Sequence, residues 1–332
     1  MNTPFRQKEK HQMKHLDQHE GSGIAVIAHT GKILGGGLDE LRRVLADNGV
    51  IEPMWYEVDK SRKAPKRVRE AIKEGARLII VWGGDGTVQR CIDVIAGTDV
   101  ALAIMPAGTA NLLATNLGVS GDIAGAVRTA LHGVRRRIDV GTVNGECFAV
   151  MGGAGFDGVL MANVSSAEKD QIGRLAYLRG SVQAMKEKRT KTKIRIDGHV
   201  WFDGPTSCVL VGNVGTITGG LQVFDNAKAD DGRLDVGVVS ADGPLQWARV
   251  LGRLIVRSDV DRSPFVDSTQ AAKIDVQFDK KVPYEIDGGP RGKTNRLKIR
   301  VRPQAIIVCV PEAANLSASN TVFREPAVAA HA

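Results

Sequence analysis

The 332-residue chain is poor in aromatic residues and cysteines and has no long apolar run, and each shortage excludes a class of protein. The strongest apolar runs are far shorter than the roughly 18 residues that cross a bilayer: Leu78–Trp82, Val100–Met105 and Ala305–Val310. The four cysteines are far apart and form no Cys-x-x-Cys pair, so we expect buried, reduced thiols and no disulfide scaffold. With 43% hydrophobic and 25% charged residues, the chain can bury a core, which excludes a disordered protein.

The N-terminal segment also lacks an apolar core, so residues 1–21 are expected to be a flexible tail and not a secretory signal. The net charge of +8 favours an anionic partner. No aromatic residues are interleaved with the basic runs, and no helix-turn-helix or zinc-ligand pattern accompanies them, which argues against nucleic acid. An anionic lipid surface or a phosphate substrate fits the charge equally well. We therefore expect a cytoplasmic protein in peripheral contact with the inner face of a membrane.

The first third of the chain alternates short β-branched runs with amphipathic stretches, which is the pattern of a parallel sheet covered by helices. Helices are predicted over 38–48, 65–74 and 88–95, and strands over Ile24–Ala28, Ile51–Val58, Leu78–Trp82 and Ala101–Met105. Binding loops are expected at the carboxyl ends of these strands.

The pattern changes near Arg137, where antiparallel pairing is predicted to begin. Asn144-Gly145 is the dipeptide that a type I′ turn prefers, and it separates two apolar runs, Ile138–Val143 and Glu146–Met151. Further strands are predicted over 193–196, 200–202, 208–211, 234–239, 273–278, 297–301 and 305–310, with a helix over 172–185 and a helix or a crossover over 245–256. The sequence thus predicts an α/β domain over 22–136, a β-rich domain over 137–311, and a C-terminal tail over 312–332 for which a return to the first domain is one alternative.

The most informative segment is Gly83-Gly84-Asp85-Gly86-Thr87, which directly follows a buried strand and leads into a helix. Glycines let a backbone approach a ligand closely, and the N-terminus of the following helix attracts an anion. Asp85 beside phosphates would require an intervening cation, which favours a Mg²⁺ nucleotide. The alternative is a tight turn in which the aspartate bonds locally. A second such loop, Pro106-Ala107-Gly108-Thr109-Ala110-Asn111, follows the next strand, and the two would flank one crevice.

Together, these loops resemble the catalytic domain of the diacylglycerol kinase and sphingosine kinase family, and the bacterial soluble lipid kinases are the nearest type. The resemblance continues in the same order, over roughly residues 22–310, through Gly155-Phe156-Asp157, Gly212-Asn213, Asp230-Asp231-Gly232 and Asp287-Gly288. It implies an α/β nucleotide-binding domain of the NAD kinase and diacylglycerol kinase type, joined to a mainly antiparallel β-sandwich domain. In that family, ATP donates its γ-phosphate to a lipid hydroxyl in the cleft between the domains.

The resemblance also assigns site residues. Asp85 would act through Mg²⁺, and Asp230, Asp231 and the carbonyl of Arg233 would hold a structural Mg²⁺, for which a turn with solvated acids is the alternative. Nucleotide-binding residues would be Gly83, Gly84, Asp85, Gly86, Thr87, Val88, Gln89, Gly108, Thr109 and Asn111.

The chain departs from the family at its general base. The family carries that base in an Asp-Gly-Glu segment, for which this chain has Asp287-Gly288-Gly289. Because the glutamate is missing, we predict that Asp287 accepts the proton of the lipid hydroxyl. A second departure is Leu112, where many members of the family carry an aspartate.

Two other functions remain as alternatives. An NAD kinase-like phosphotransferase has a similar Gly-Gly-Asp-Gly turn, although the second loop resembles lipid kinases. A catalytically impaired lipid or nucleotide sensor would explain Gly289. No motif records the acceptor lipid or the oligomeric state, although an exposed strand edge in the second domain would suit a homodimer.

Overall fold

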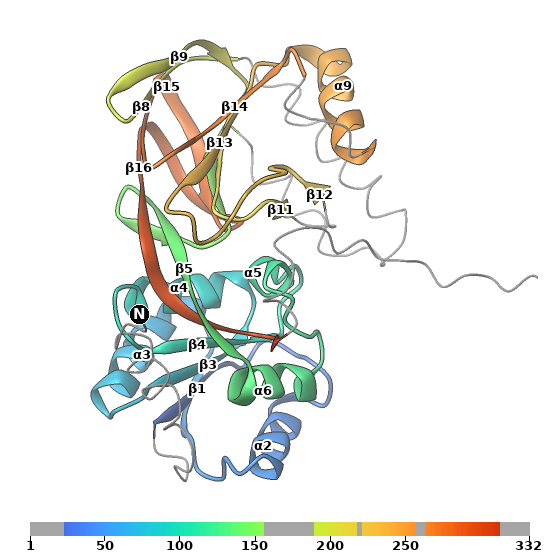
Figure 1. Cartoon of the computed structure of the whole chain (residues 1–332), viewed down its shortest axis with the longest axis vertical. Coiled ribbons are helices and arrows are strands. Elements are labelled where there is room, and N and C mark those ends of the chain that lie inside the picture. Colours follow the sequence, from blue (N-terminus) through green and yellow to red (C-terminus); the bar gives the residue numbers. More distant parts are fainter. Residues whose placement is uncertain (1–22, 156–188, 218–220, 257–262, 313–332) are drawn as a thin grey trace, which may run out of the picture.

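The computed structural model describes residues 23–155, 189–217, 221–256 and 263–312, and Figure 1 shows them as a helix-covered lower half and a mainly β upper half. The predicted N-terminal tail, the helix predicted over 172–185 and residues 313–332 lie outside the described residues. All four cysteines are free and buried, as the sequence predicts. Among the described helices, none combines the length and the apolar character needed to cross a membrane.

The N-terminal half contains four parallel strands in the order β2-β1-β3-β4. These strands are β1 (Ile24–His29), β2 (Met54–Val58), β3 (Leu78–Gly83) and β4 (Ala101–Pro106). Their connections form the helices η1 (Ser61–Lys63), α2 (Gly37–Asp47), α3 (Ala64–Lys73), α4 (Asp85–Ile95), α5 (Leu112–Asn116) and α6 (Ile123–His132). The predicted parallel α/β domain is confirmed.

Helices cover both faces of this sheet, which is why β3 and β4 are continuous apolar runs. Alternate side chains of each strand enter separate core clusters. Val26 and Ile80 pack with α2 and α6, whereas Ile27 and Val81 pack with α3 and α4. The sequence did not indicate α6, although Asp122 caps it by accepting a hydrogen bond from Gly125 N–H at 2.7 Å.

The C-terminal half is mainly antiparallel, in the order β14-β13-β10-β7-β15-β16, which confirms the predicted β-sandwich class. Its first strands are β5 (Val134–Val143), β6 (Glu146–Phe148), β7 (Met151–Ala154), β8 (Thr190–Ile196), β9 (His199–Thr206) and β10 (Cys208–Gly212). The remaining elements are β11 (Thr216–Ile217), β12 (Leu221–Gln222), β13 (Leu234–Val239), α9 (Gly243–Val256), β14 (Val266–Ala271), β15 (Lys273–Ile286) and β16 (Gly289–Val310).

Two long strands, β5 and β16, run from one half of the molecule to the other (Figure 1). β16 pairs with β15 at its start and, through Ile307 and Val308, lies parallel to β4 at its end. Separate strands over 297–301 and 305–310 were therefore a wrong prediction, because β16 is one strand with an irregularity between Arg302 and Ile306. The predicted run Glu146–Met151 instead divides into β6 and β7.

Three two-residue hairpin turns of type I′ shape the second half, and Asp197-Gly198 forms the one between β8 and β9. Asn144 and Gly145 have φ values of 53° and 95°, so the predicted turn between β5 and β6 is confirmed. Asp287 and Gly288, at 46° and 74°, form a turn of the same kind between β15 and β16. The β15–β16 turn holds Asp287, a predicted site residue, in a tight conformation.

Candidate active site

A cavity of about 480 Å³ lies where the loops after β1, β2, β3 and β4 meet the β15–β16 turn. The carboxyl ends of parallel strands are the usual position for a ligand in an open α/β sheet. The α/β domain contributes both glycine loops to the wall, and the second domain contributes Ile286 to Gly289. The structure therefore brings Asp85, Gly108, Thr109 and Asp287 to one place.

The two glycine loops touch each other backbone to backbone. A Cβ atom added to Gly108 would lie 2.3 Å from Gly84 Cα, and one added to Gly84 would lie 3.0 Å from Gly108 Cα. Only glycine fits this contact on both sides. Gly86, by contrast, faces open space, since nothing lies within 4 Å of an added Cβ. The loops therefore present bare backbone to the cavity.

Asn111 and Asp85 hold these loops together. Asn111 has a left-handed φ of 48°, its Oδ1 accepts from Gly108 N–H at 2.9 Å, and its amide donates to the carbonyls of Pro106 and Gly108, both at 2.8 Å. Asp85 Oδ1 accepts from Leu112 N–H at 2.6 Å, which ties the start of α4 to the start of α5. Burial raises the pKa of Asp85, whereas the backbone N–H groups of α5 oppose that rise.

The remaining residues of the first loop take other positions. Thr87 is buried, and its hydroxyl lies 2.9 Å from that of Ser61, so its side chain braces the loop after β2. Val88 packs in the core, and Gly83 ends β3, where an added Cβ would strike Thr87. Gln89 lines the cavity but uses its amide to bond the second domain. In the described part of the chain, no side chain caps α4, which leaves its N-terminus toward the cavity for an anion.

Asp287 is part of the cavity wall on the side of the second domain. Its two carboxylate oxygens accept hydrogen bonds from three backbone N–H groups at 2.9 to 3.0 Å, those of Ala149, Val150 and Met151. Burial raises the pKa of Asp287 to about 7, the three N–H groups oppose this, and the charge of Asp85 raises it further. A carboxyl with this pKa in a fixed position suits general-base work near neutral pH.

Positive side chains that sequence reasoning missed complete the wall: Lys32, Arg62, Arg90 and Arg291. They outnumber the two carboxyls, Asp85 and Asp287, so the cavity favours an anion. Lys32 and Arg62 lie in the loops that follow β1 and β2. Because ligands bind at the carboxyl ends of parallel strands, their position after predicted strands could have identified them from the sequence. No sequence pattern indicated Arg291, because only the folding of the β15–β16 hairpin brings it to the cavity.

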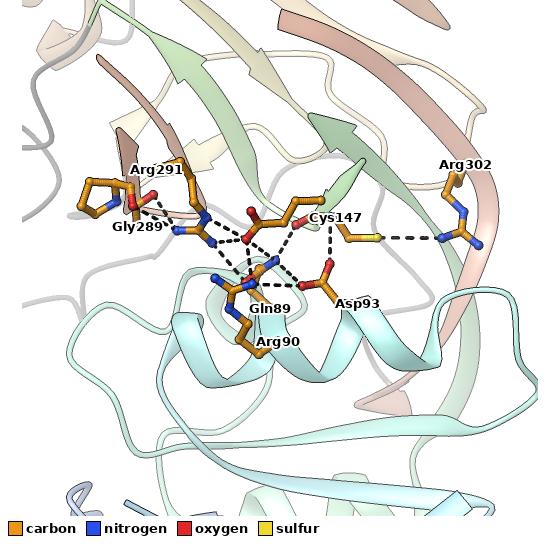
Figure 2. Close-up of polar contacts among 9 residues, drawn as sticks. Gln89, Arg90, Asp93, Cys147, Gly289, Arg291 and Arg302 are labelled. Atoms are coloured by element: carbon orange, nitrogen blue, oxygen red, sulfur yellow. Dashed lines mark hydrogen bonds and ion pairs between the residues drawn. The ribbon is translucent and has the colours of Figure 1, made fainter. Parts of the chain in front are cut away.

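A polar network joins the two domains beside this cavity. Figure 2 shows Arg291 from β16 and Gln89 from α4 reaching toward each other. Glu146 on β6 accepts from Arg291 Nε at 2.7 Å and pairs with Arg90 at 3.1 Å. Burial alone would raise the pKa of Glu146, but the two arginines hold it below its usual value. Gln89 also donates to Cys147 O at 2.8 Å, so α4 is attached to the second domain at several points.

The same network occupies the space where the family's glutamate would begin. Arg291 Nη1 donates to Gly289 O at 2.9 Å, and a Cβ atom added to Gly289 would lie only 2.6 Å from that nitrogen. A side chain at position 289 would therefore have to displace the guanidinium. Glycine at this position and Arg291 are structurally coupled.

The predicted structural Mg²⁺ residues lie away from the cavity wall. Asp230 forms an ion pair with Arg136 at 2.7 Å, and Asp231 Oδ1 accepts from Arg233 N–H at 2.9 Å. Across the residues that the structure describes, no cluster of three or more His, Cys, Asp or Glu side chains could hold a metal ion. A metal site at this turn stays a prediction.

Comparisons with known families agree with this division of the site. The sequence profile of the Diacylglycerol kinase catalytic domain matches residues 30–143, which contain both glycine loops. The profile of the YegS C-terminal NAD kinase beta sandwich-like domain matches residues 151–310, which contain Asp287.

Individual relatives extend over most of the chain. The Diacylglycerol kinase of Bacillus subtilis (strain 168) is 30% identical over 229 residues, which are 68% of this chain and 75% of the relative. A Probable lipid kinase YegS-like of Pseudomonas fluorescens is 30% identical over 277 residues, which are 82% of this chain and 89% of the relative. The crystal structure of a diacylglycerol kinase from Bacillus anthracis str. Sterne, 22% identical, shares the fold with a TM-score of 0.70 over 90% of this chain and 100% of its own. The chain therefore belongs to the diacylglycerol kinase and YegS-like family of lipid kinases.

Proposed function

We propose that the protein is an ATP- and Mg²⁺-dependent kinase that transfers the γ-phosphoryl group to a hydroxyl of diacylglycerol or a related lipid. One observation supports this most strongly. Two touching glycine loops and a buried carboxyl with a pKa raised to about 7 line one cavity, and they come from different domains. This arrangement suits an enzyme that joins a phosphate donor to an acceptor alcohol.

The residues present fit a nucleoside triphosphate. The contact between Gly84 and Gly108 holds the two glycine loops together, and Gly86 leaves open space beside the start of α4. Backbone N–H groups at a helix N-terminus bind phosphate oxygens, and Lys32 and Arg62 add positive charge from the neighbouring loops. When bound, ATP supplies the transferable phosphoryl group. Thr109, exposed on the cavity wall, is positioned to donate its hydroxyl to a phosphate.

The residues also fit Mg²⁺ as a companion of the phosphates. Mg²⁺ is usually bound by one or two carboxylates with phosphates and water completing its shell, so a three-residue cluster is not required. Asp85 belongs to the first glycine loop and lines the cavity, and its Oδ1 accepts from Leu112 N–H. We assign Asp85 to this role and to the bracing of the two loops.

Asp287 is proposed to accept the proton of the lipid hydroxyl at a carboxylate oxygen. Proton removal by a positioned base is most effective when the pKa of the base lies near the working pH. The three N–H groups from residues 149–151 fix the orientation of Asp287, so the missing family glutamate need not be replaced by a distant residue. The network around Arg291 keeps the turn that carries Asp287 against the glycine loops.

The acceptor lipid, peripheral contact with an anionic membrane and a homodimer remain predictions. Net positive charge supports attraction to an anionic lipid surface, where a lipid acceptor would be met. The natural tests are sedimentation with vesicles that contain phosphatidylglycerol and measurement of mass in solution.

The test of the proposed function is transfer of labelled γ-phosphate from ATP with Mg²⁺ to a panel of acceptors. The panel contains dioleoylglycerol in mixed micelles, sphinganine, ceramide and NAD, and Asp85→Ala and Asp287→Asn are assayed beside the wild type. Labelling of one lipid class, lost in both variants, supports the proposal. Labelling of NAD alone would replace it with the NAD kinase-like alternative, and ATP binding without transfer to any acceptor would favour the sensor.

A further inference from the structure

Glu285, two residues before Asp287 in the sequence, is a buried carboxyl with one oxygen that has no hydrogen-bond partner among the described residues. Its side chain is only 7% exposed, and within the described part of the chain Oε2 has no hydrogen-bond partner. Most buried polar atoms in proteins are hydrogen-bonded, so each exception requires an explanation such as a ligand. A buried carboxyl oxygen without a hydrogen bond destabilises a fold, which favours a functional explanation for this residue.

The register of the strands shows where Glu285 points. Ile286 enters the sandwich core with Val282, so strand alternation places Glu285 on the opposite face of β15. On that face Glu285 lies across from Gly153 of β7, which in turn pairs with Leu210 of β10. The fully buried thiol of Cys208 lies close enough for the charge of Glu285 to raise its pKa. Among the described residues, the neighbours of Glu285 across the sheet are therefore a glycine and a buried thiol.

Glu285 is also close to the proposed reaction centre. Asp287 follows it by two residues, and the carboxylate of Asp287 likewise turns toward the chain around β7, where it bonds residues 149–151. Ile286, between them, lines the cavity. Asp85, Asp287 and Ile286 thus line the cavity, and Glu285 directly precedes Ile286 on β15.

We propose that Glu285 binds the polar end of the acceptor lipid by accepting a hydrogen bond from its hydroxyl or ammonium group. This inference rests on the proposed lipid kinase function and adds a recognition residue to it. A donor on the acceptor would bond the unpaired Oε2, and the burial of Glu285 would strengthen the bond by excluding water. A neutral diacylglycerol and a cationic sphingoid base share this donor chemistry, and they differ in charge.

The test compares Glu285→Gln and Glu285→Leu with Asp279→Asn, an exposed acid on the same strand. Phosphorylation of dioctanoylglycerol and of sphinganine is measured, together with the KM for ATP. Glu285→Leu should raise the KM for the recognised acceptor about tenfold or more, the effect of one lost hydrogen bond to a charged group, and leave the KM for ATP unchanged. Glu285→Gln keeps an accepting oxygen, so it should spare dioctanoylglycerol and weaken sphinganine if the ligand is an ammonium.

Melting temperature separates binding from a structural role. Removing an unpaired buried acid should leave the melting temperature of Glu285→Leu unchanged or raise it, whereas a structural acid would lower it. Added dioctanoylglycerol or sphinganine should stabilise the wild type and Asp279→Asn more than Glu285→Leu. Equal acceptor KM values in wild type and Glu285→Leu would overturn the inference. If the wild type phosphorylates no lipid, the proposed function fails, and equal stabilisation of both proteins by these lipids would overturn the role of Glu285 separately.

Discussion

Arg291→Ala is expected to loosen the contact between the two domains at the cavity wall. The side chain of Arg291 is 16% exposed and that of Glu146 is 24% exposed, so both are largely removed from water. A hydrogen bond to a charged group contributes about 1.5–3 kcal/mol. Glu146 keeps Arg90 at 3.1 Å, and solvent partly screens the pair. We therefore expect a loss of about 2 kcal/mol in the free energy of unfolding, in the lower half of that range.

Urea unfolding measures this loss, and Arg296→Ala is the matched control. Arg296 is 60% exposed, and its ion pair with Asp275 is long, at 3.9 Å. Its removal should change the free energy of unfolding by no more than about 0.5 kcal/mol. A double-mutant cycle with Glu146→Gln should show coupling between Arg291 and Glu146, because the two residues share a bond at 2.7 Å.

The pH dependence gives a second readout of the same network. Arg291 and Arg90 hold the pKa of Glu146 below its usual 4.5, so this stabilisation is present above pH 4.5 and is lost as the pH falls through the lowered value. Arg291→Ala should weaken that acid-dependent loss. If Arg291→Ala behaves like Arg296→Ala in both experiments, the reasoning that the network holds the domains together is refuted.

Three further outcomes are expected. Gly108→Ala should lower nucleotide affinity, measured by calorimetry, far more than Gly121→Ala. The Cβ at position 108 would lie 2.3 Å from Gly84 Cα, whereas nothing lies within 4 Å of a Cβ added to Gly121, which is not part of the cavity wall; equal effects would contradict this. Burial raises the pKa of Glu285 from 4.5 to about 7, so the free energy of unfolding should fall as the pH rises from about 4.5 to 7. Glu285→Gln should reduce this dependence on pH in unfolding curves, and an unchanged dependence would contradict the reasoning. Asp287→Asn replaces an acceptor with a donor facing three N–H groups and should cost about 1–3 kcal/mol of stability as well as transfer activity; native stability would exclude this bonding.

Local patterns made much of the fold predictable. The turn at Asn144-Gly145 follows from residues that accept positive φ, and the strands β1, β3 and β4 follow from buried apolar runs. Both glycine loops were recognisable because each lies between such a strand and a helix. These features depend on neighbours within a few residues, which a sequence shows directly.

Features that depend on distant partners were not predictable. β16 continues through Gln304 because Asp139, far away in sequence, accepts its N–H at 2.7 Å. Arg291 reaches the cavity only because the β15–β16 turn folds back against α4. The lack of a hydrogen-bond partner for Glu285 Oε2 among the described residues results from the packing of the sheet, and no local sequence pattern indicates it.

The most direct test of the central claim is transfer of labelled γ-phosphate from ATP to dioctanoylglycerol by the wild type, Asp85→Ala and Asp287→Asn. Asp39→Ala serves as the control, since this acid is 99% exposed on α2. The proposed active site predicts rapid labelling by the wild type and by Asp39→Ala, and loss of labelling in the two cavity variants while both still melt cooperatively. Labelling that persists in Asp85→Ala and Asp287→Asn would contradict the placement of the reaction in this cavity.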